Sequence, residues 1–183
     1  MSHIKYNILI VIALVFCSSC NLFDKKDKKV ITAEDIKKYE ERNIEINREI
    51  VQLKQDTIKQ YIAAHNLTME KTGSGLWYNI KRSADTMSIL KNDIVEIEYS
   101  ISLLNGKQCY SSDSLGRKTF KVGQGGVESG LEEAIVMLHK GDTAELLIPP
   151  HLAHGLMGDQ NKIPVLAILH YNVVVTNVFK AKN

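Results

Sequence analysis

Residues 122–155 read VGQGGVESGLEEAIVMLHKGDTAELLIPPHLAHG, a stretch that contains signals for a turn, a helix and a buried strand. The closely spaced glycines at its start predict a tight turn. After this turn, apolar residues recur at helical spacing and predict one buried helix face, formed by Leu131, Ala134, Ile135 and Leu138. Gly141 follows His139 and Lys140 and is expected to stop this helix. The apolar run 144–148, which ends at two prolines, predicts a buried strand.

The segments on either side of this stretch predict strands and hairpins. Apolar and polar residues alternate strictly across 95–102, which predicts a strand with one solvent-exposed face. Its inward residues are Val95, Ile97, Tyr99 and Ile101. Asn105-Gly106 predicts a hairpin turn, residues 109–117 a polar loop and 119–122 a short strand. The final strand is expected within 166–179, with one face formed by Leu169, Tyr171, Val173 and Val175. Strands on both sides of one short helix indicate an α+β domain.

An earlier segment, residues 32–65, predicts one long helix. Thr32 and Asp35 resemble a capping box at its start. Its apolar residues recur at steps of three or four with gaps, namely Ile36, Tyr39, Ile46, Ile50, Leu53 and Tyr61. This stripe is too narrow for a regular coiled coil. The helix is therefore expected either to pack on the domain or to pair with a second copy in a homodimer.

The first residues have the pattern of an export signal. The apolar run 8–16 is too short to span a bilayer, and the small residues Cys17-Ser18-Ser19-Cys20 follow it. This pattern resembles a bacterial lipobox, with cleavage before Cys20 and lipid attached to its sulfur; an ordinary secretory peptide is the alternative. Lipid on Cys20 would anchor the protein in the bacterial cell envelope. The expected parts are a signal peptide (1–19), a lipidated cysteine with a charged tether (20–31), a helical extension (32–71) and the folded domain (72–183), which begins at the turn 72–75.

Composition and motifs exclude several classes of function. The formal net charge is +2, and both signs are mixed along the chain, which argues against a nucleic-acid partner. His151 and His154 lie near Asp159 without the spacing of a zinc protease, so no metal is expected. The glycine-rich turn is not followed by GK[ST] and is therefore not a phosphate-binding loop.

The central stretch resembles the FK506-binding-protein (FKBP) family of peptidyl-prolyl isomerases. The resemblance is carried by VGQGGVESGLEE, by LLIPPHLAHG and by Ile163-Pro164, and it extends over about residues 76–179. It implies an antiparallel sheet wrapped around a short helix, and an activity that needs no cofactor. The implied ligands are proline-containing polypeptide segments, bound in an apolar hollow beside the helix and under the long loop.

The resemblance also implies the site residues. The pocket tyrosine corresponds to Tyr99, two wall positions correspond to Val127 and Ile163, and Tyr171 stands where the family commonly has phenylalanine. His154 replaces the loop tyrosine that donates to a substrate carbonyl. Trp77 is taken as a further aromatic residue that favours a working pocket.

Besides His154, four residues depart from the family pattern. Cys109 and Tyr110 replace a Phe-Asp pair, Leu131 replaces the tryptophan of the pocket floor, and Glu128 replaces an apolar residue. Because leucine is smaller than tryptophan, we expect a wider and less aromatic pocket.

Two functions follow from the resemblance as expectations. The first is a membrane-anchored prolyl isomerase that assists the folding of exported envelope proteins. The second is a catalytically weak or inactive binding module in an envelope or motility assembly. The segment YSISLLNGKQCYSSDSLGRKTF, together with the lipobox and the helix, is similar to FKBP-like lipoproteins associated with gliding motility in Bacteroidetes.

Overall fold

The computed structural model describes residues 31–182. The predicted signal peptide, the lipidation of Cys20 and the charged tether up to residue 30 lie outside the described residues. The chain divides into two compact units, Met1–Arg42 and Asn43–Asn183, and the sheet lies in the second. In the described part of the chain, no helix is both long and apolar enough to cross a membrane.

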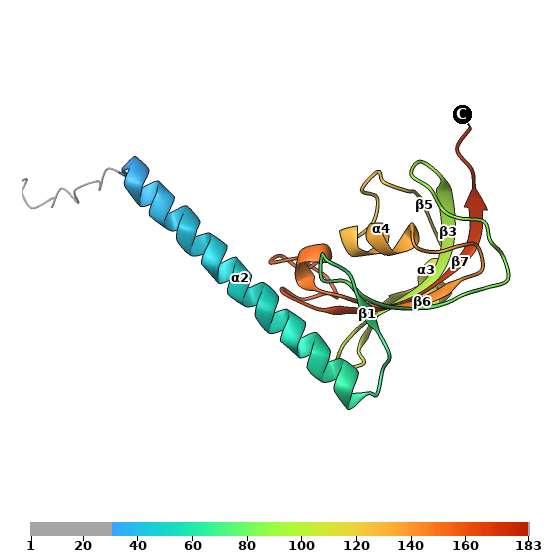
Figure 1. The fold of residues 1–183 in the computed structure, drawn as a ribbon, viewed down its shortest axis with the longest axis horizontal. Helices are drawn as coiled ribbons and strands as arrows, with labels where there is room; N and C mark the ends of the chain where they lie inside the picture. The colour runs from blue at the N-terminus through green and yellow to red at the C-terminus, as the bar shows by residue number, and fades with distance from the viewer. Residues whose placement is uncertain (1–30, 183) are drawn as a thin grey trace, which may run out of the picture. The chain divides into compact units, whose positions relative to one another are not determined.

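Within residues 31–182, an antiparallel sheet of seven strands forms the framework of the second unit (Figure 1). Its strands pair in the order β1-β2-β6-β7-β3-β4, and β5 pairs with the other half of the β3 edge. The strands are β1 (Glu70–Lys71), β2 (Trp77–Lys81), β3 (Ile94–Leu103), β4 (Gln108–Ser111), β5 (Lys118–Lys121), β6 (Thr143–Ile148) and β7 (Leu169–Phe179). The helices are α2 (Ala33–Ala64), α3 (Ser112–Leu115) and α4 (Ser129–Ile135), with a 3₁₀ turn η2 (Pro150–Leu152). The predicted α+β architecture is confirmed.

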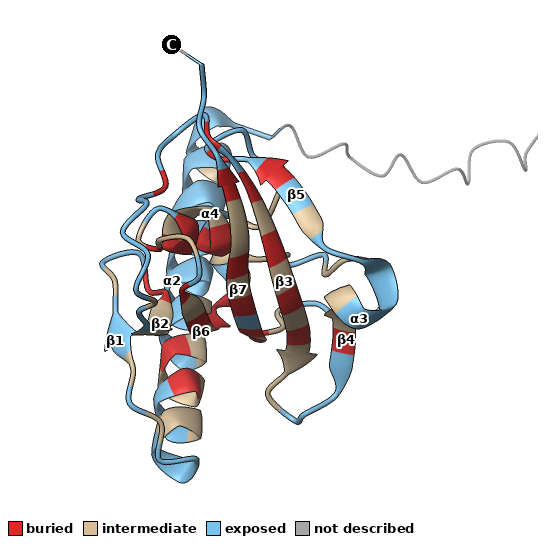
Figure 2. Ribbon diagram, turned by 90° about the vertical axis from the view of Figure 1, so that its right-hand side faces the viewer, coloured by how far each residue is buried: buried red, intermediate tan, exposed pale blue. Residues whose placement is uncertain are grey.

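The main core lies between α4 and one face of the sheet. The inward residues predicted for β3 and β7 are all buried, and Figure 2 shows buried and half-buried residues alternating along both strands. From α4, the residues Leu131, Ala134 and Ile135 enter the same cluster. The alternation in sequence therefore specifies which sheet face receives the helix.

The long helix α2 begins as predicted but buries a different face. At its start, the amide of Asp35 donates to the hydroxyl of Thr32 and the amide of Thr32 donates to the Asp35 carboxylate, both at 3.1 Å. Near its end, Gln55 and Ile58 are buried, whereas Leu53 of the predicted stripe is 64% exposed. The buried face is specified by contacts with the sheet, which the spacing of apolar residues alone did not reveal.

Two predicted segments differ in the structure. Helix α4 ends at Ile135 instead of residue 140, because the amides of Met137 and Leu138 bond three residues back and tighten the chain into turns. Residues 109–117 are not a polar loop. Strand β4 pairs with β3 and buries two of its residues, and α3 follows directly.

Candidate active site

A glycine turn positions the start of α4. Gly123 and Gly125 adopt φ of 77° and 72°, which favours glycine. Their amides donate to the two carboxylate oxygens of Glu132, at 2.7 and 3.1 Å. The carbonyl of Glu128 then accepts the amides of Leu131 and Glu132 and starts the helix. This clamp fixes the direction in which residues 127–131 point.

Two tyrosines from adjacent strands form an aromatic wall beside α4. Tyr99 on β3 and Tyr171 on β7 lie with ring centroids 6.2 Å apart. Leu131 and Ile163 belong to the same buried cluster, and Val127 packs against it. The structure thus brings together, around one end of α4, the residues that the family resemblance assigned to the pocket.

The expected wide hollow is not open in the structure. Leu131 and Tyr171 have no exposed surface and Ile163 is 3% exposed, so the predicted floor and walls are covered. Leucine, although smaller than tryptophan, is in close contact with its neighbours because the surrounding side chains fill the space.

Glu128 introduces a carboxylate among the aromatic residues. Its side chain is only 8% exposed. Burial, followed by the charge of Glu128, raises the pKa of the Tyr99 and Tyr171 hydroxyls above the usual value of a phenol. The Tyr171 hydroxyl lies close enough to the Glu128 carboxylate for a hydrogen bond between them to contribute to this rise in its pKa. Among the described residues, the buried Tyr171 hydroxyl and Glu128 Oε2 have no other hydrogen-bond partner.

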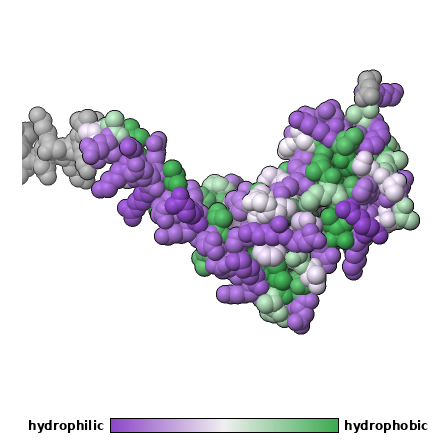
Figure 3. Space-filling model, in the orientation of Figure 1, coloured by the Kyte–Doolittle hydropathy of each residue, from purple (hydrophilic) through white to green (hydrophobic). Residues whose placement is uncertain are grey.

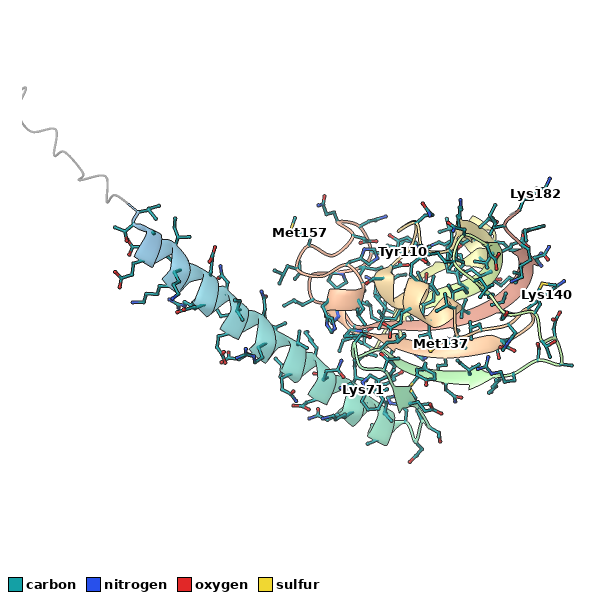
Figure 4. The ribbon with its side chains drawn as sticks, turned by 45° about the horizontal axis from the view of Figure 1, so that its top comes forward. Lys71, Tyr110, Met137, Lys140, Met157 and Lys182 are labelled. Carbon is teal, nitrogen blue, oxygen red and sulfur yellow. The ribbon has the colours of Figure 1, made fainter. Side chains whose placement is uncertain are left out.

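The loop after η2 forms the rim of the site. His154 Nε2 lies 3.4 Å from Glu128 Oε1, and the imidazole is partly exposed. On the opposite side, the Tyr110 hydroxyl donates to Asp159, tying β4 to this loop. Figure 4 labels Tyr110, and Met157 on the exposed part of the loop. The rim of the site therefore contains the imidazole of His154, the phenol of Tyr110 and the carboxylate of Asp159.

Asp159 is a structural residue of the site that sequence reasoning did not assign. Its carboxylate accepts the amides of Asn161 and Ile163 at 2.9 and 2.7 Å. Burial would raise its pKa, but the bond from Tyr110 and these amides outweigh it, and the pKa lies below its ordinary value. In turns, an aspartate side chain commonly accepts a hydrogen bond from the amide two residues later. This preference is the sequence signal that could have identified the role of Asp159.

Of two other residues named from the sequence, Cys109 belongs to the same buried cluster as the two tyrosines, whereas Trp77 does not. Cys109 is 2% exposed, and burial raises the pKa of its thiol, so it is a packing residue with low reactivity. Trp77 does not join the pocket. Its indole donates to Gln55 on α2, and it packs against the separate cluster that contains Ile58.

Comparisons with known proteins place these features in a family. The family model for FKBP-type peptidyl-prolyl cis-trans isomerases matches residues 86–176. FK506-binding protein 2 of Dictyostelium discoideum is 32% identical over 94 residues, which cover 51% of this chain and 71% of that protein. The chain belongs to the FKBP-type peptidyl-prolyl cis-trans isomerase family.

Other relatives are longer than the matched region. The probable FKBP-type isomerase FkpA of Neisseria meningitidis is 32% identical over 116 residues, covering 63% of this chain and 42% of that protein. FKBP11 of Bos taurus is 33% identical over 89 residues, covering 49% of this chain and 44% of that protein. The chain therefore spans less than half the length of these two relatives.

Two solved structures share the fold. The crystal structure of AtFKBP13 matches with a TM-score of 0.57 and 26% identity, covering 60% of this chain and 98% of that chain. The crystal structure of FkpA from Escherichia coli matches with a TM-score of 0.62 and 22% identity, covering 97% of this chain and 83% of that chain. Both likenesses confirm the FKBP-like sheet and helix.

Proposed function

We propose that this protein catalyses cis–trans isomerisation of X-Pro bonds, with the site around Tyr99 and Tyr171. The observation that carries the proposal is the meeting of the two tyrosines with Val127 and Ile163 at the start of α4, in a chain of the FKBP-type family. The ligands are proline-containing segments of polypeptide.

The mechanism requires no metal or acid–base group. The barrier to rotation is the amide resonance, about 18–20 kcal/mol. A site accelerates rotation if it binds the twisted amide more tightly than the planar one. An apolar, aromatic surface favours the twisted state because this state is less dipolar. His154 donates a hydrogen bond to a substrate carbonyl and holds the segment while the bond rotates.

The direct test is isomerisation of a proline peptide by the purified full chain, with and without FK506. We expect a rate at least about tenfold above the uncatalysed reaction, which takes tens of seconds. Inhibition by the drug would locate the activity in the apolar site. A folded chain that produces no acceleration would contradict the proposal.

That negative result would favour a second function, a binding module of the same fold. Glu128 and the covered floor are the observations that favour it, since both reduce the apolar surface available to a proline ring. The module would bind a polypeptide segment without accelerating its isomerisation. If the chain does not accelerate isomerisation but still binds proline peptides, this second function is supported. If it neither isomerises nor binds them, both functions are contradicted.

We further propose a lipid anchor on Cys20 and a place in the bacterial cell envelope, where the protein would assist folding of exported proteins. The leader sequence supports this proposal. A link to gliding motility is part of the same proposal. It is supported by the similarity of residues 99–120 to FKBP-like lipoproteins that are associated with gliding motility. Metabolic labelling with a fatty acid, compared between the full chain and Cys20→Ala, tests the anchor.

A homodimer through the 32–65 helix is also a proposal. Apolar side chains lie scattered among polar ones along α2 in Figure 3, and Ile44, Ile46 and Leu53 are 58%, 42% and 64% exposed. A concentration-dependent mass in sedimentation, lost in Leu53→Glu, would support the dimer.

A further inference from the structure

Two lysines at the rim of the candidate site hold their ammonium groups over its tyrosines. Lys118 Nζ lies 5.1 Å from the centre of the Tyr99 ring, and Lys162 Nζ lies 5.1 Å from the centre of the Tyr110 ring. Tyr99 belongs to the aromatic wall and Tyr110 to the rim. Prolyl isomerisation does not explain either lysine, because rotation about the amide bond transfers no proton.

The register of β5 places Lys118 beside the aromatic wall. Residues opposite each other in an antiparallel pair share one face of the sheet, and Lys118 lies opposite Ile97, an inward residue of β3. The next inward residue of β5, Phe120, is buried, whereas Lys118 is half-buried at the start of the strand. A lysine can pack its stem against apolar neighbours while its ammonium stays in water. Lys118 therefore carries a positive charge at a position where the alternation favours an apolar residue.

The loop after η2 fixes the backbone of Lys162. The Asp159 carboxylate accepts the amides of Asn161 and Ile163, the residues on either side of Lys162, at 2.9 and 2.7 Å. The carbonyl of Lys162 accepts the Cys109 thiol at 3.5 Å. The side chain of Lys162 is nevertheless exposed. Its ammonium is therefore accessible to a ligand that lies next to the wall residue Ile163.

Both ammonium groups lack an acidic partner in the described part of the chain. None of the ion pairs formed within residues 31–182 includes Lys118 or Lys162. The carboxylates of the site are engaged elsewhere, since Glu128 is buried 3.4 Å from His154 and Asp159 accepts two loop amides. The charges left without a partner at the rim are therefore positive.

We propose that Lys118 and Lys162 make the site selective for X-Pro segments that carry an aspartate or glutamate beside the proline. The proline lies against the aromatic wall, and the neighbouring carboxylate accepts from an ammonium at the rim. An ammonium has three donors, so it can bind an anion while it remains over a ring. A lysine or arginine beside the proline is disfavoured by repulsion. This inference rests on the proposed isomerase function and names the class of segment that the site takes.

The test compares kcat/KM of the full chain for peptides with glutamate, leucine or lysine on either side of the proline. At low ionic strength we expect the glutamate peptide to exceed the leucine peptide about three- to fivefold on at least one side, the gain that one or two exposed ion pairs provide. The lysine peptide should be the poorest. Because salt screens exposed charges, the glutamate-to-leucine ratio should approach one in about 1 M NaCl.

Substitution of the two lysines tests their part in this preference. The double variant Lys118→Gln with Lys162→Gln keeps most of the side-chain length and should bring the glutamate-to-leucine ratio close to one. The double variant Lys118→Glu with Lys162→Glu should turn over the lysine peptide faster than the glutamate peptide. A glutamate preference that survives both double changes would overturn the proposal.

A matched control removes the same charge from the outer face of the sheet. Lys81 on β2 and Lys121 on β5 are both exposed, and Lys121 lies opposite Ile94, which is itself exposed. The double variant Lys81→Gln with Lys121→Gln should keep the glutamate preference. If it lowers the ratio as much as the change at Lys118 and Lys162, the preference comes from the overall charge and the proposal is overturned.

The outcomes separate this inference from the function beneath it. Turnover of all peptides with equal kcat/KM would leave the isomerase intact and overturn the selectivity. Absence of isomerisation with every peptide would contradict the proposed function. Fluorescence anisotropy with the same peptides measures the glutamate-to-leucine ratio of affinities independently of turnover. An affinity ratio above one that falls in the double glutamine variant supports the selectivity, and equal affinities or no binding would contradict it.

Discussion

At the residue scale, His154 connects the rim of the site to its interior. It stands where the family has a loop tyrosine, and its Nε2 lies 3.4 Å from Glu128 Oε1. An imidazole can donate one hydrogen bond outward while remaining close to a carboxylate. The sequence resemblance indicated the position, and the structure added the contact with Glu128.

We predict that His154→Leu lowers kcat/KM for X-Pro isomerisation about tenfold, because it removes the loop donor. His154→Gln retains a donor and should recover part of the loss. His65→Leu is a control, since His65 is exposed at the end of α2 and bonds only the Tyr61 carbonyl among the described residues. A coupled peptide assay measures all three variants. Unchanged turnover in His154→Leu would remove this residue from the site.

At the element scale, the end of α2 is joined to the sheet by one buried amide. Gln55 donates to the Gly75 carbonyl and accepts from the Trp77 indole, each at 2.8 Å. Ile58, fully buried, packs beside it against Leu147 and Ile168. These contacts explain why Gln55, a polar residue, faces inward while Leu53 faces solvent.

We predict that Gln55→Leu destabilises the protein by about 1–3 kcal/mol, because it leaves the half-buried Trp77 N–H and the buried Gly75 carbonyl without partners. Gln60→Leu is the matched control, since Gln60 is exposed on the same helix. Urea unfolding followed by tryptophan fluorescence gives both free energies. Equal stability of the two variants would show that the end of α2 is not held by this amide.

At the scale of the whole molecule, resistance to acid depends on a buried carboxylate before β6. Asp142 is fully buried and accepts the amides of Ser83 and His139 and the guanidinium of Arg82, at 2.6, 2.8 and 2.8 Å. Burial would raise its pKa, but these donors outweigh it and lower the pKa to about 2. Asp142 thereby ties the segment after β2 to the turn after α4.

The folded pKa lies below the unfolded value, so the stabilisation is fully present above pH 3.8 and is lost as the pH falls toward 2. This difference corresponds to about 2 kcal/mol. We predict that the free energy of unfolding of the full chain decreases by about this amount, beyond the contribution of other carboxylates, between pH 5 and about pH 2. Asp142→Asn should be less stable at neutral pH and should show a flatter acid dependence, measured by urea unfolding at each pH. The same acid slope in both proteins would contradict the assignment.

Sequence periodicity alone specified the strands β3, β6 and β7 and the buried face of α4, because alternation and helical spacing are local consequences of burial. The family resemblance correctly placed Tyr99, Tyr171, Leu131 and Ile163 in one cluster. Their roles with a ligand stay predictions. The homodimer through α2, the lipid on Cys20 and the domain start at Thr72 stay predictions as well.

The tertiary structure decided the rest. It placed Trp77 with Gln55 and Ile58 instead of in the pocket, ended α4 at Ile135, and joined Tyr110 to Asp159 across 49 residues of sequence. It also showed the Glu128 side chain buried beside the Tyr171 hydroxyl. Local patterns indicate which residues are buried. Strand order and the paths of the loops determine which buried groups come into contact. They bring together segments that are far apart in the sequence, so local patterns do not reveal these contacts.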